Sequence, residues 1–510
     1  MKKARTSTNQ QFQIFSKFNL LFTDWRNYSL IFLIVTAIVF SNQIWIHSET
    51  RPPHWDMATH LSNSLTYFNR FNLSQLFEYI FTYRFYPPLV YWNASIYLSL
   101  FGFSIPTAIL SNFTFLLILS YSTYELGKEF WSKSVGLLAT VFLLATPMFV
   151  SQFKEFQIDA PLSAMVALAL VLLIKTREFS SEKRSIVFGI VFGLGLLTKW
   201  TFLLFMILPL FTALFLTLRS VINKKRELFR VRNAIFSGLV AYLVSGFWYL
   251  SNLRNLRIDV VASLQSGIKE GDPLVGSLES NLYYFFNLIN SQLYLVPVLF
   301  FLTGLFFLYY KRDAINLRKN LYLLTFIFGA VLIFTFLRNK DARYTLPILS
   351  AVAVVSTFWL NFLKEKQRLV LSILLIGYSI LTFLAVSFGL SFLPKNVIVD
   401  LNEKNKLVLF AQNGYLIGPP TRENWYLVEA IEYIKKTPNS SFAFEGLDTI
   451  WFNKSALSFY AQKGQLRFVS NSQEADLLLI RNGEEINCPS ERVETKTFLL
   501  PDGTKLKICK

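Results

Sequence analysis

Long apolar runs recur along most of this chain, and they limit its possible folds more than any other feature. They begin at Tyr28 and continue to Leu390, and most are long enough to cross a hydrocarbon layer of about 30 Å. Only 16% of the residues are charged and 53% are hydrophobic, whereas a soluble domain carries about a quarter charged residues. The sequence therefore predicts a polytopic α-helical membrane protein.

Eleven segments are predicted to span the membrane. They lie at residues 28–46, 105–125, 134–150, 159–175, 185–198, 200–218, 232–250, 291–310, 320–337, 344–361 and 368–389. Lys and Arg concentrate in the loops that face the cytoplasm if the N-terminus lies inside, as the positive-inside rule requires. The net charge of +18 follows this topology, so we expect membrane lipids as partners and no nucleic acid. The basic N-terminus precedes an apolar run without a cleavage site, which indicates a retained anchor.

One further apolar stretch, Leu89–Phe103, would change this topology if it crossed the membrane. It is short, follows Pro87–Pro88, and contains aromatic and polar side chains, so we expect it to lie at the membrane surface. The odd number of spans then places the C-terminus on the extracytoplasmic side. The expected location is a bacterial plasma membrane, crossed many times, with a cytoplasmic N-terminus.

Three regions follow from these patterns. Residues 1–27 form a basic cytoplasmic N-terminus, residues 28–394 form the transmembrane domain with a first outer loop at 47–104, and residues 395–510 form a small extracytoplasmic α/β domain. In that last region helical spacing at Trp425–Lys436 and Asn453–Gln462 alternates with strand patterns at 441–445, 466–469, 475–481 and 492–500. The two cysteines, Cys488 and Cys509, could pair outside the cytoplasm, and two free thiols are the alternative.

Asp56 is a candidate general base. It follows His54-Trp55 just after the first predicted span, and a helix that begins there would place Asp56 and His60 on one face. A carboxylate in an aromatic-rich, partly dehydrated pocket gains proton affinity and can take a proton from an acceptor. Asp is also a favoured helix N-cap, so a structural role is the alternative.

Two further candidates lie at the outer ends of predicted spans. Asp159 stands two residues before Pro161, where it could either cap a helix or hold an acceptor. Lys199 lies between two apolar runs, and its ammonium could either snorkel to the surface or bind a phosphate. The sequence leaves both alternatives open.

Basic residues also gather in a loop assigned to the outside, against the positive-inside tendency. Arg338, Lys340 and Arg343 lie there, and a phosphate or pyrophosphate at the membrane surface would explain them, because Arg pairs with phosphate oxygens and Lys acts as a point charge. Anchoring to lipid headgroups is the alternative. Arg84 is a further candidate for the same phosphate.

Six short motifs occur in one order along the chain. They are Pro53-His54-Trp55-Asp56, Phe85-Tyr86-Pro87-Pro88-Leu89, Gln157-Ile158-Asp159-Ala160-Pro161-Leu162, Gly195-Leu196-Leu197-Thr198-Lys199, Gly246-Phe247-Trp248-Tyr249 and Arg343-Tyr344-Thr345-Leu346-Pro347. Their order and shared outer placement resemble the GT-C membrane glycosyltransferases, specifically the family 39 type that includes protein O-mannosyltransferases and the aminoarabinose transferase of lipid A. The resemblance covers nearly the whole chain, since these relatives also carry a soluble outer C-terminal domain.

The resemblance implies a GT-C fold with about eleven to thirteen transmembrane helices, a sugar donor on polyprenyl phosphate or diphosphate, and inverting transfer at the outer face. By position, Asp56 matches the general base and Asp159 the second acidic residue near the acceptor. Lys199 and Arg343 match basic positions that face the carrier phosphate.

Other positions depart from the family pattern or leave a role open. Trp55 and Met57 flank Asp56, where relatives carry an acidic pair, so we predict no cofactor, and nothing supports a divalent metal. His60, Tyr86 and Tyr344 are candidates to contact the acceptor or to support the site. A lipid, a protein or a glycan could be the acceptor.

Two other classes of function remain open. A lipid-linked glycan ligase or polymerase would share the basic loops without needing Asp56. A non-enzymatic lipid or glycan transporter is the second alternative. The predicted spans carry almost no ionisable residue near the membrane centre, where transporters usually place them. This distribution favours chemistry at one membrane face.

Overall fold

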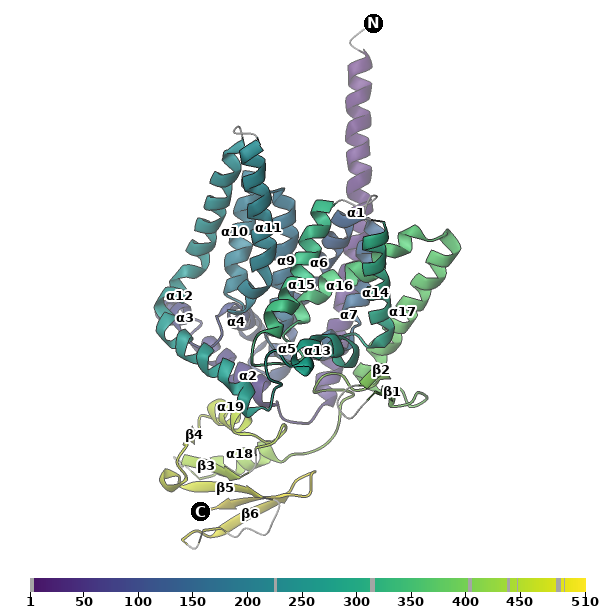
Figure 1. Cartoon of the computed structure of the whole chain (residues 1–510). Helices are drawn as coiled ribbons and strands as arrows, with labels where there is room; N and C mark the ends of the chain where they lie inside the picture. The colour runs from purple at the N-terminus through teal and green to yellow at the C-terminus, as the bar shows by residue number, and fades with distance from the viewer. Residues whose placement is uncertain are drawn as a thin grey trace.

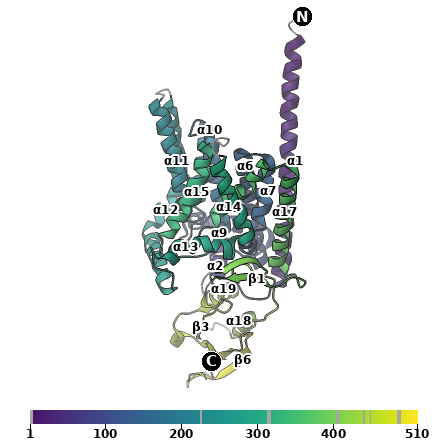
Figure 2. The ribbon, with the colours of Figure 1, turned by 45° about the vertical axis from the view of Figure 1, so that its right-hand side comes forward.

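A computed structural model describes residues 4–223, 227–311, 317–401, 406–437, 441–446, 448–482, 488–489 and 491–510. The helices form one bundle, and a small sheet with two helices lies at one end of it (Figure 1). Helix α1 (Ala4–Ser48) projects from the opposite end, and the chain finishes in the sheet domain (Figure 2). The polytopic helical fold with a small C-terminal α/β unit is as the sequence predicted.

All eleven predicted spans fall on helices. Besides α1, these are α5 (Ile105–Leu110), α6 (Asn112–Phe130), α7 (Lys133–Leu144), α8 (Pro147–Gln152), α9 (Asp159–Thr176), α10 (Glu182–Leu196), α11 (Phe202–Asn223), α12 (Phe229–Lys269), α14 (Leu295–Tyr310), α15 (Leu317–Thr335), α16 (Leu349–Phe358), with the 3₁₀ turns η5 (Leu346–Ile348) and η6 (Trp359–Phe362), and α17 (Glu365–Phe388). Among the described residues, six helices are long and apolar enough to cross a membrane. A predicted span at 134–150 is divided into α7 and α8 just before Pro147, which cannot continue a helix.

Short helices cover the end of the bundle that faces the sheet domain (Figure 1). They are α2 (Trp55–Asn69), η1 (Leu73–Gln75), α3 (Leu76–Phe81), α4 (Leu89–Phe101), α13 (Leu278–Asn287) and the π-helical turn η3 (Leu288–Gln292). Helix α4 has 13 residues and rises only about 20 Å, which is less than a hydrocarbon layer of about 30 Å. It packs against α2 and α5, and its position at the membrane surface stays a prediction.

Helix α9 lies at the centre of the bundle. In its apolar window 83% of the residues are buried, and it packs against α6, α10, α11 and η5. Its neighbour α10 approaches α12 closely at Gly189, where a Cβ atom would lie 2.4 Å from the Ser237 carbonyl oxygen. Small residues allow such close helix contacts in membranes. Because α9 is enclosed on all sides, its first residue, Asp159, is fixed in position.

The C-terminal unit contains a five-stranded mixed sheet in the order β4-β3-β5-β7-β6. Its strands are β3 (Ser441–Gly446), β4 (Arg467–Phe468), β5 (Leu477–Asn482), β6 (Glu494–Leu499) and β7 (Lys505–Cys509), with the helices α18 (Leu427–Lys435) and α19 (Lys454–Gly464) and the turn η7 (Ser472–Glu474). β3 pairs in parallel with β4 and β5, whereas β7 runs antiparallel to β5 and β6. The predicted helices and strands are confirmed to within a few residues.

Three strands were not predicted. β1 (Asn396–Asp400) and β2 (Lys406–Ala411) form an antiparallel pair outside the main sheet. All five residues of β1 are exposed, so this strand lacks the alternation of buried and exposed residues that identifies a strand in a sequence. The third, β7, is short and carries two lysines among its five residues.

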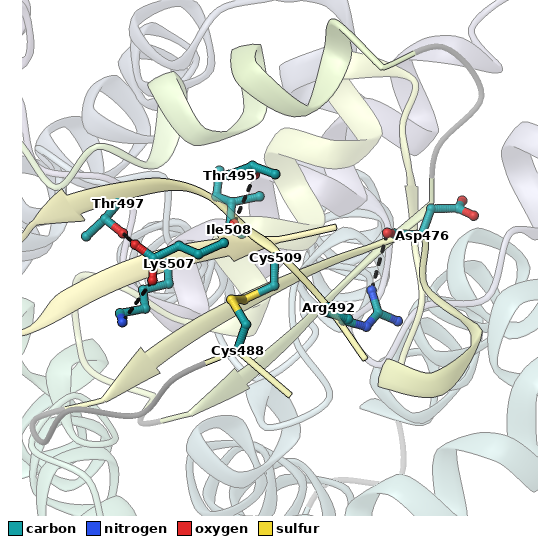
Figure 3. Close-up of a disulfide and its surroundings, with 9 residues drawn as sticks. Asp476, Cys488, Arg492, Thr495, Thr497, Lys507, Ile508 and Cys509 are labelled. Carbon is teal, nitrogen blue, oxygen red and sulfur yellow. Dashed lines mark hydrogen bonds and ion pairs between the residues drawn. A yellow bond between two sulfur atoms is a disulfide. The ribbon is translucent and has the colours of Figure 1, made fainter. Parts of the chain in front are cut away.

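Cys488 and Cys509 form a disulfide (Figure 3). Cys509 ends the buried strand β7, and its partner lies 21 positions earlier in the sequence. The bond therefore ties the segment before β6 to the middle of the sheet. Of the two alternatives for these cysteines, the structure contains the paired one, which is the form that persists in oxidising compartments.

Removing this disulfide should destabilise the C-terminal unit. Because the bond closes a loop of 21 positions, loop-closure entropy predicts that Cys488→Ser/Cys509→Ser lowers the free energy of unfolding by about 3 kcal/mol. Pulse proteolysis of the full-length protein, with peptides assigned to residues 427–510, measures this change. Equal protease resistance of the variant and the wild type would contradict a stabilising disulfide.

Candidate active site

Arg343 lies between two carboxylates. Its Nη1 is 2.8 Å from Asp56 Oδ2, while its Nη2 and Nε donate to Asp341 at 2.7 Å and 3.1 Å. Asp56 comes from α2, and the other two residues come from the loop after α15. The guanidinium side chain is 11% exposed, so this contact joins the first outer loop to the second half of the bundle.

Asp56 is not the N-cap of its helix. Helix α2 begins at Trp55, and its N-cap residue is His54, which makes no side-chain capping bond. The capping alternative for Asp56 is therefore wrong, because its carboxylate is directed to Arg343. Burial alone would raise the pKa of Asp56, but the Arg343 guanidinium lowers it to about 2. The Asp56 side chain is still 50% exposed, so other molecules can reach it.

A second ion pair joins Lys199 to Asp159. Lys199 Nζ donates to Asp159 Oδ1 at 2.7 Å, and the two side chains are 6% and 5% exposed. Asp159 is the first residue of α9, and the N-cap position is taken by Ile158. Capping by Asp159 and snorkelling by Lys199 are therefore both excluded, since each side chain is buried against the other.

Two tyrosines link the ion pairs. Lys199 Nζ lies 5.3 Å from the ring centroid of Tyr86 and 5.6 Å from that of Tyr344, which are distances typical of cation–π contacts. Tyr86, Tyr344, Asp159 and Lys199 all line one small cavity of about 30 Å³, which has room for about one water molecule. The His60 ring also contacts Tyr86, with ring centroids 5.4 Å apart. The structure thus brings together seven of the ten predicted site residues.

His60 is buried beside the two ion pairs. Its Nδ1 lies 2.9 Å from the Tyr91 hydroxyl oxygen, and its side chain shares the face of α2 that carries Asp56. Burial lowers the pKa of His60 from 6.5 to about 4, against the opposing effect of the Asp56 charge. The imidazole is therefore neutral at physiological pH.

Three predicted phosphate ligands lie elsewhere. Lys340 Nζ donates to the carbonyl oxygens of Phe334, Thr335 and Leu337, at the C-terminal end of α15, where carbonyl groups lack the next helical turn. Arg84 donates to the Tyr83 carbonyl and the Thr66 hydroxyl. Among the residues that the structure describes, Arg338 forms no ion pair, and neither it nor the other two contacts Asp56 or Asp159.

Two residues of the site were not predicted. Asp341 accepts from Arg343 and also from the Tyr415 hydroxyl at 3.0 Å, and the Tyr415 ring centroid lies 5.7 Å from Arg343 Cζ. Asp341 could have been found, because it lies in the basic loop two positions before Arg343. Tyr415 follows β2 in an irregular segment, where no sequence pattern marks it. The described residues contain no group of three metal-binding side chains, and the absence of a metal stays a prediction.

Replacing His60 should change how stability depends on pH. The pKa of His60 is about 4 in the folded protein and 6.5 in the unfolded chain, so the unfolded chain binds more protons between these values and stability falls as pH decreases. Between pH 7 and pH 5 this effect removes about 2 kcal/mol, and His60→Gln lacks it. Thermal unfolding in detergent at both pH values measures the difference.

His47→Gln provides the matched control, because His47 lies exposed near the end of α1. The control should lose as much stability as the wild type on acidification. A His60→Gln variant that loses the same amount would contradict the buried, neutral state of this imidazole.

Comparisons with known proteins identify what this chain is similar to. Residues 86–260 match the family model of dolichyl-phosphate-mannose-protein mannosyltransferases. An uncharacterized protein of Aquifex aeolicus (strain VF5) is 26% identical over 317 residues, which cover 60% of this chain and 59% of that relative. The chain thus spans less than two thirds of the curated relative that it matches.

Solved structures share the fold across most of the chain. ArnT from Cupriavidus metallidurans in the apo state has a TM-score of 0.59 at 13% identity and covers 89% of this chain and 92% of its own. The same protein bound to undecaprenyl phosphate gives 0.52 at 16% identity, covering 69% and 65%. An oligosaccharyltransferase of Archaeoglobus fulgidus, in complex with Zn and sulfate, gives 0.52 at 12% identity, covering 87% and 62%.

The family model and the shared fold both test the resemblance that the six motifs predicted. The family-model match includes the motifs at Tyr86, Asp159, Lys199 and Gly246, and the structural match to apo ArnT covers 89% of the chain. The predicted resemblance is confirmed at the level of the fold, which the chain shares with ArnT, and residues 86–260 match the mannosyltransferase family model.

Proposed function

We propose that this protein transfers a sugar from a polyprenyl-phosphate or polyprenyl-diphosphate donor to an acceptor, with inversion at the anomeric carbon. The observation that carries the proposal is the convergence of two ion pairs, Asp56–Arg343 and Asp159–Lys199. Their residues come from α2, the start of α9, the turn after α10 and the loop after α15. These segments meet at the end of the bundle that faces the sheet domain (Figure 1).

Arg343 and Lys199 are the groups that would bind the donor phosphate. Both are nearly buried, and cations in a water-poor site interact with a phosphate more strongly than they would in water. In the reaction, the bond between the anomeric carbon and the phosphate oxygen breaks, and its electron pair stays on that oxygen. The two cations stabilise the charge that develops there. The cavity beside Lys199 and Asp159 has a volume of about 30 Å³, so the surrounding side chains must separate when a donor enters.

Asp56 would act as the general base. As the acceptor oxygen or nitrogen attacks the anomeric carbon on the face opposite the phosphate, its proton passes to the Asp56 carboxylate, and the new bond forms with inversion. While Arg343 holds the pKa of Asp56 at about 2, this carboxylate is a weak base. A donor phosphate that binds Arg343 would withdraw part of that stabilisation, so donor binding would raise the proton affinity of Asp56.

The remaining residues of the site would position these groups. Asp159 orients the Lys199 ammonium and can accept a hydrogen bond from the acceptor when the phosphate draws Lys199 away. Tyr86 and Tyr344 flank the same ammonium and offer hydroxyl groups to a sugar. Neutral His60 supports the α2 face that carries Asp56.

We also propose that the site faces the extracytoplasmic side, with residues 1–27 in the cytoplasm, 28–394 as the transmembrane catalytic domain and 395–510 outside. The disulfide in the C-terminal unit supports this orientation, because disulfides persist in oxidising compartments. The site lies at the same end of the bundle as that unit (Figure 2). A bacterial plasma membrane is the location that fits both features.

Asp56→Asn should abolish sugar transfer without abolishing donor binding. A positioned general base contributes about 10²–10⁴-fold to a reaction rate, and the amide keeps the size of the side chain but cannot take a proton. Purified protein is incubated with a library of radiolabelled polyprenyl-phosphate sugars and candidate acceptors, and transfer and donor binding are measured separately. Glu78→Gln, which changes an exposed carboxylate in the same outer loop, is the matched control.

The outcome also separates the alternative functions. Equal transfer by Asp56→Asn and wild type would exclude Asp56 as the base and indicate a lipid-linked glycan ligase or polymerase. A folded wild type that binds donor but transfers to none of the acceptors would favour a lipid or glycan transporter.

The paired substitution Lys199→Gln/Asp159→Asn should weaken donor binding. Changing both residues leaves no uncompensated charge in the buried site, so folding is preserved better than in either single variant. A lost hydrogen bond from a cation to phosphate corresponds to about a tenfold to hundredfold weaker affinity. Competition between the donor and unlabelled polyprenyl phosphate measures the change, and unaltered affinity in the folded double variant would contradict a role of Lys199 in phosphate binding.

A further inference from the structure

A second cavity lies between the first outer loop and the C-terminal unit. Its volume is about 230 Å³, which corresponds to about seven or eight water molecules. The bundle side contributes Arg51, His54 and Met57, while Trp451 and Tyr460 come from the C-terminal unit. None of these five residues belongs to the two ion pairs of the candidate active site.

Hydrogen bonds across the boundary hold the two walls together. Thr50 Oγ1 donates to the carbonyl oxygens of Thr421 and Glu423, and Trp45 Nε1 donates to the Gly418 carbonyl at 2.9 Å. The Arg51 guanidinium lies 4.2 Å from the ring centroid of Trp451 and fixes the indole from the bundle side. The cavity is therefore a built feature of the joint between the two units.

The cavity presents hydrogen-bonding groups beside apolar surface. Within the described part of the chain, neither the Trp451 indole N–H nor the Tyr460 hydroxyl has a hydrogen-bond partner. Glu155, which also lines the cavity, has one carboxylate oxygen without a partner in the same part of the chain. The indole N–H of Trp451 can thus donate a hydrogen bond to a ligand, and the Tyr460 hydroxyl can donate or accept one.

The charges in the cavity wall are compensated. Arg51 Nη2 lies 2.6 Å from Glu49 Oε2, and His54 Nε2 lies 2.7 Å from Glu155 Oε1. Burial alone would lower the pKa of His54, but the Glu155 carboxylate raises it. An ionic head group would find no unpaired charge in the cavity, whereas a neutral hydroxylated molecule would find an aromatic wall and unused hydrogen-bonding groups.

The cavity adjoins the candidate active site. His54 and Met57 line it, and Asp56, which lies between them in the sequence, points to Arg343. The first turn of α2 therefore faces the ion pairs on one side and lines the cavity on the other. A molecule that occupies the cavity could extend one group toward Asp56.

We infer that this cavity binds a neutral sugar ring of the acceptor. The inference rests on the proposed function, since only a glycosyl transfer gives the neighbouring Asp56 an acceptor to deprotonate. The ring would pack an apolar face against Trp451 beside the Arg51 guanidinium, which covers one face of the indole, and its hydroxyl groups would meet Tyr460 and the wall of the first outer loop. The acceptor is then a glycan or a glycolipid.

The test measures binding of sugars rather than transfer. Full-length protein in lipid nanodiscs is examined by saturation-transfer difference NMR with glucose, galactose, mannose and N-acetylglucosamine. We expect saturation transfer to the ring protons of at least one of these sugars, and an affinity about tenfold weaker in Trp451→Ala, because an aromatic stacking partner is lost. Phe498→Ala, which removes an aromatic ring from strand β6 of the same unit, should bind as the wild type does.

The outcomes distinguish failure of the sugar site from failure of the proposed sugar transfer. Absence of saturation transfer to every sugar, or equal binding by Trp451→Ala, would overturn the sugar site even if radiolabelled donor is still transferred. Displacement of the bound sugar by inorganic phosphate or glycerol phosphate would also overturn it, because the cavity would then recognise an anion. Sugar binding that depends on Trp451, in a protein that binds no polyprenyl-phosphate donor, would support the cavity and refute the proposed function instead.

Discussion

The geometry of the site depends on one arginine held between two carboxylates. Arg343 binds Asp56 from α2 and Asp341 from its own loop, and a buried guanidinium needs both charge compensation and directed acceptors. Without it, Asp56 would be a carboxylate beside buried aromatic rings with no cation to stabilise it. The same contact fixes α2 against the loop after α15, so the first outer loop and the second half of the bundle share one anchor.

The C-terminal unit contributes to this arrangement. Tyr415, which precedes the sheet domain in the chain, donates to Asp341, and Trp451 and Tyr460 form one wall of the second cavity. The loop 49–51 in turn binds the segment around Thr421. A domain that only covered the bundle would not need contacts to the residues that orient Arg343. Its position is therefore coupled to the charge arrangement around Asp56.

Much of this could be predicted from the sequence, because membrane spans are identified by length and apolarity alone. Asp56, Asp159, Lys199 and Arg343 were identified from motifs at the outer ends of spans, but not their pairing, which joins segments far apart in the chain. The sequence also shows which residues are charged, but it does not show which group each charged side chain contacts. Lys340 and Lys199 are the same residue type, yet Lys340 binds carbonyl groups at the end of α15 and just after it, and only the backbone path of that loop decides this.

The charges of the site suggest why binding of the donor phosphate would be linked to the proton affinity of Asp56. Three carboxylates, Asp56, Asp159 and Asp341, surround two cations, Lys199 and Arg343, so an incoming phosphate must compete with carboxylates for both. Asp341 is bound to Arg343 through two nitrogens and to Tyr415, whereas Asp56 has one contact with Arg343 and a half-exposed side chain. Asp56 is thus the carboxylate that a phosphate displaces most easily. The Asp56 carboxylate, once the donor phosphate has displaced it from Arg343, is then free to take the acceptor proton.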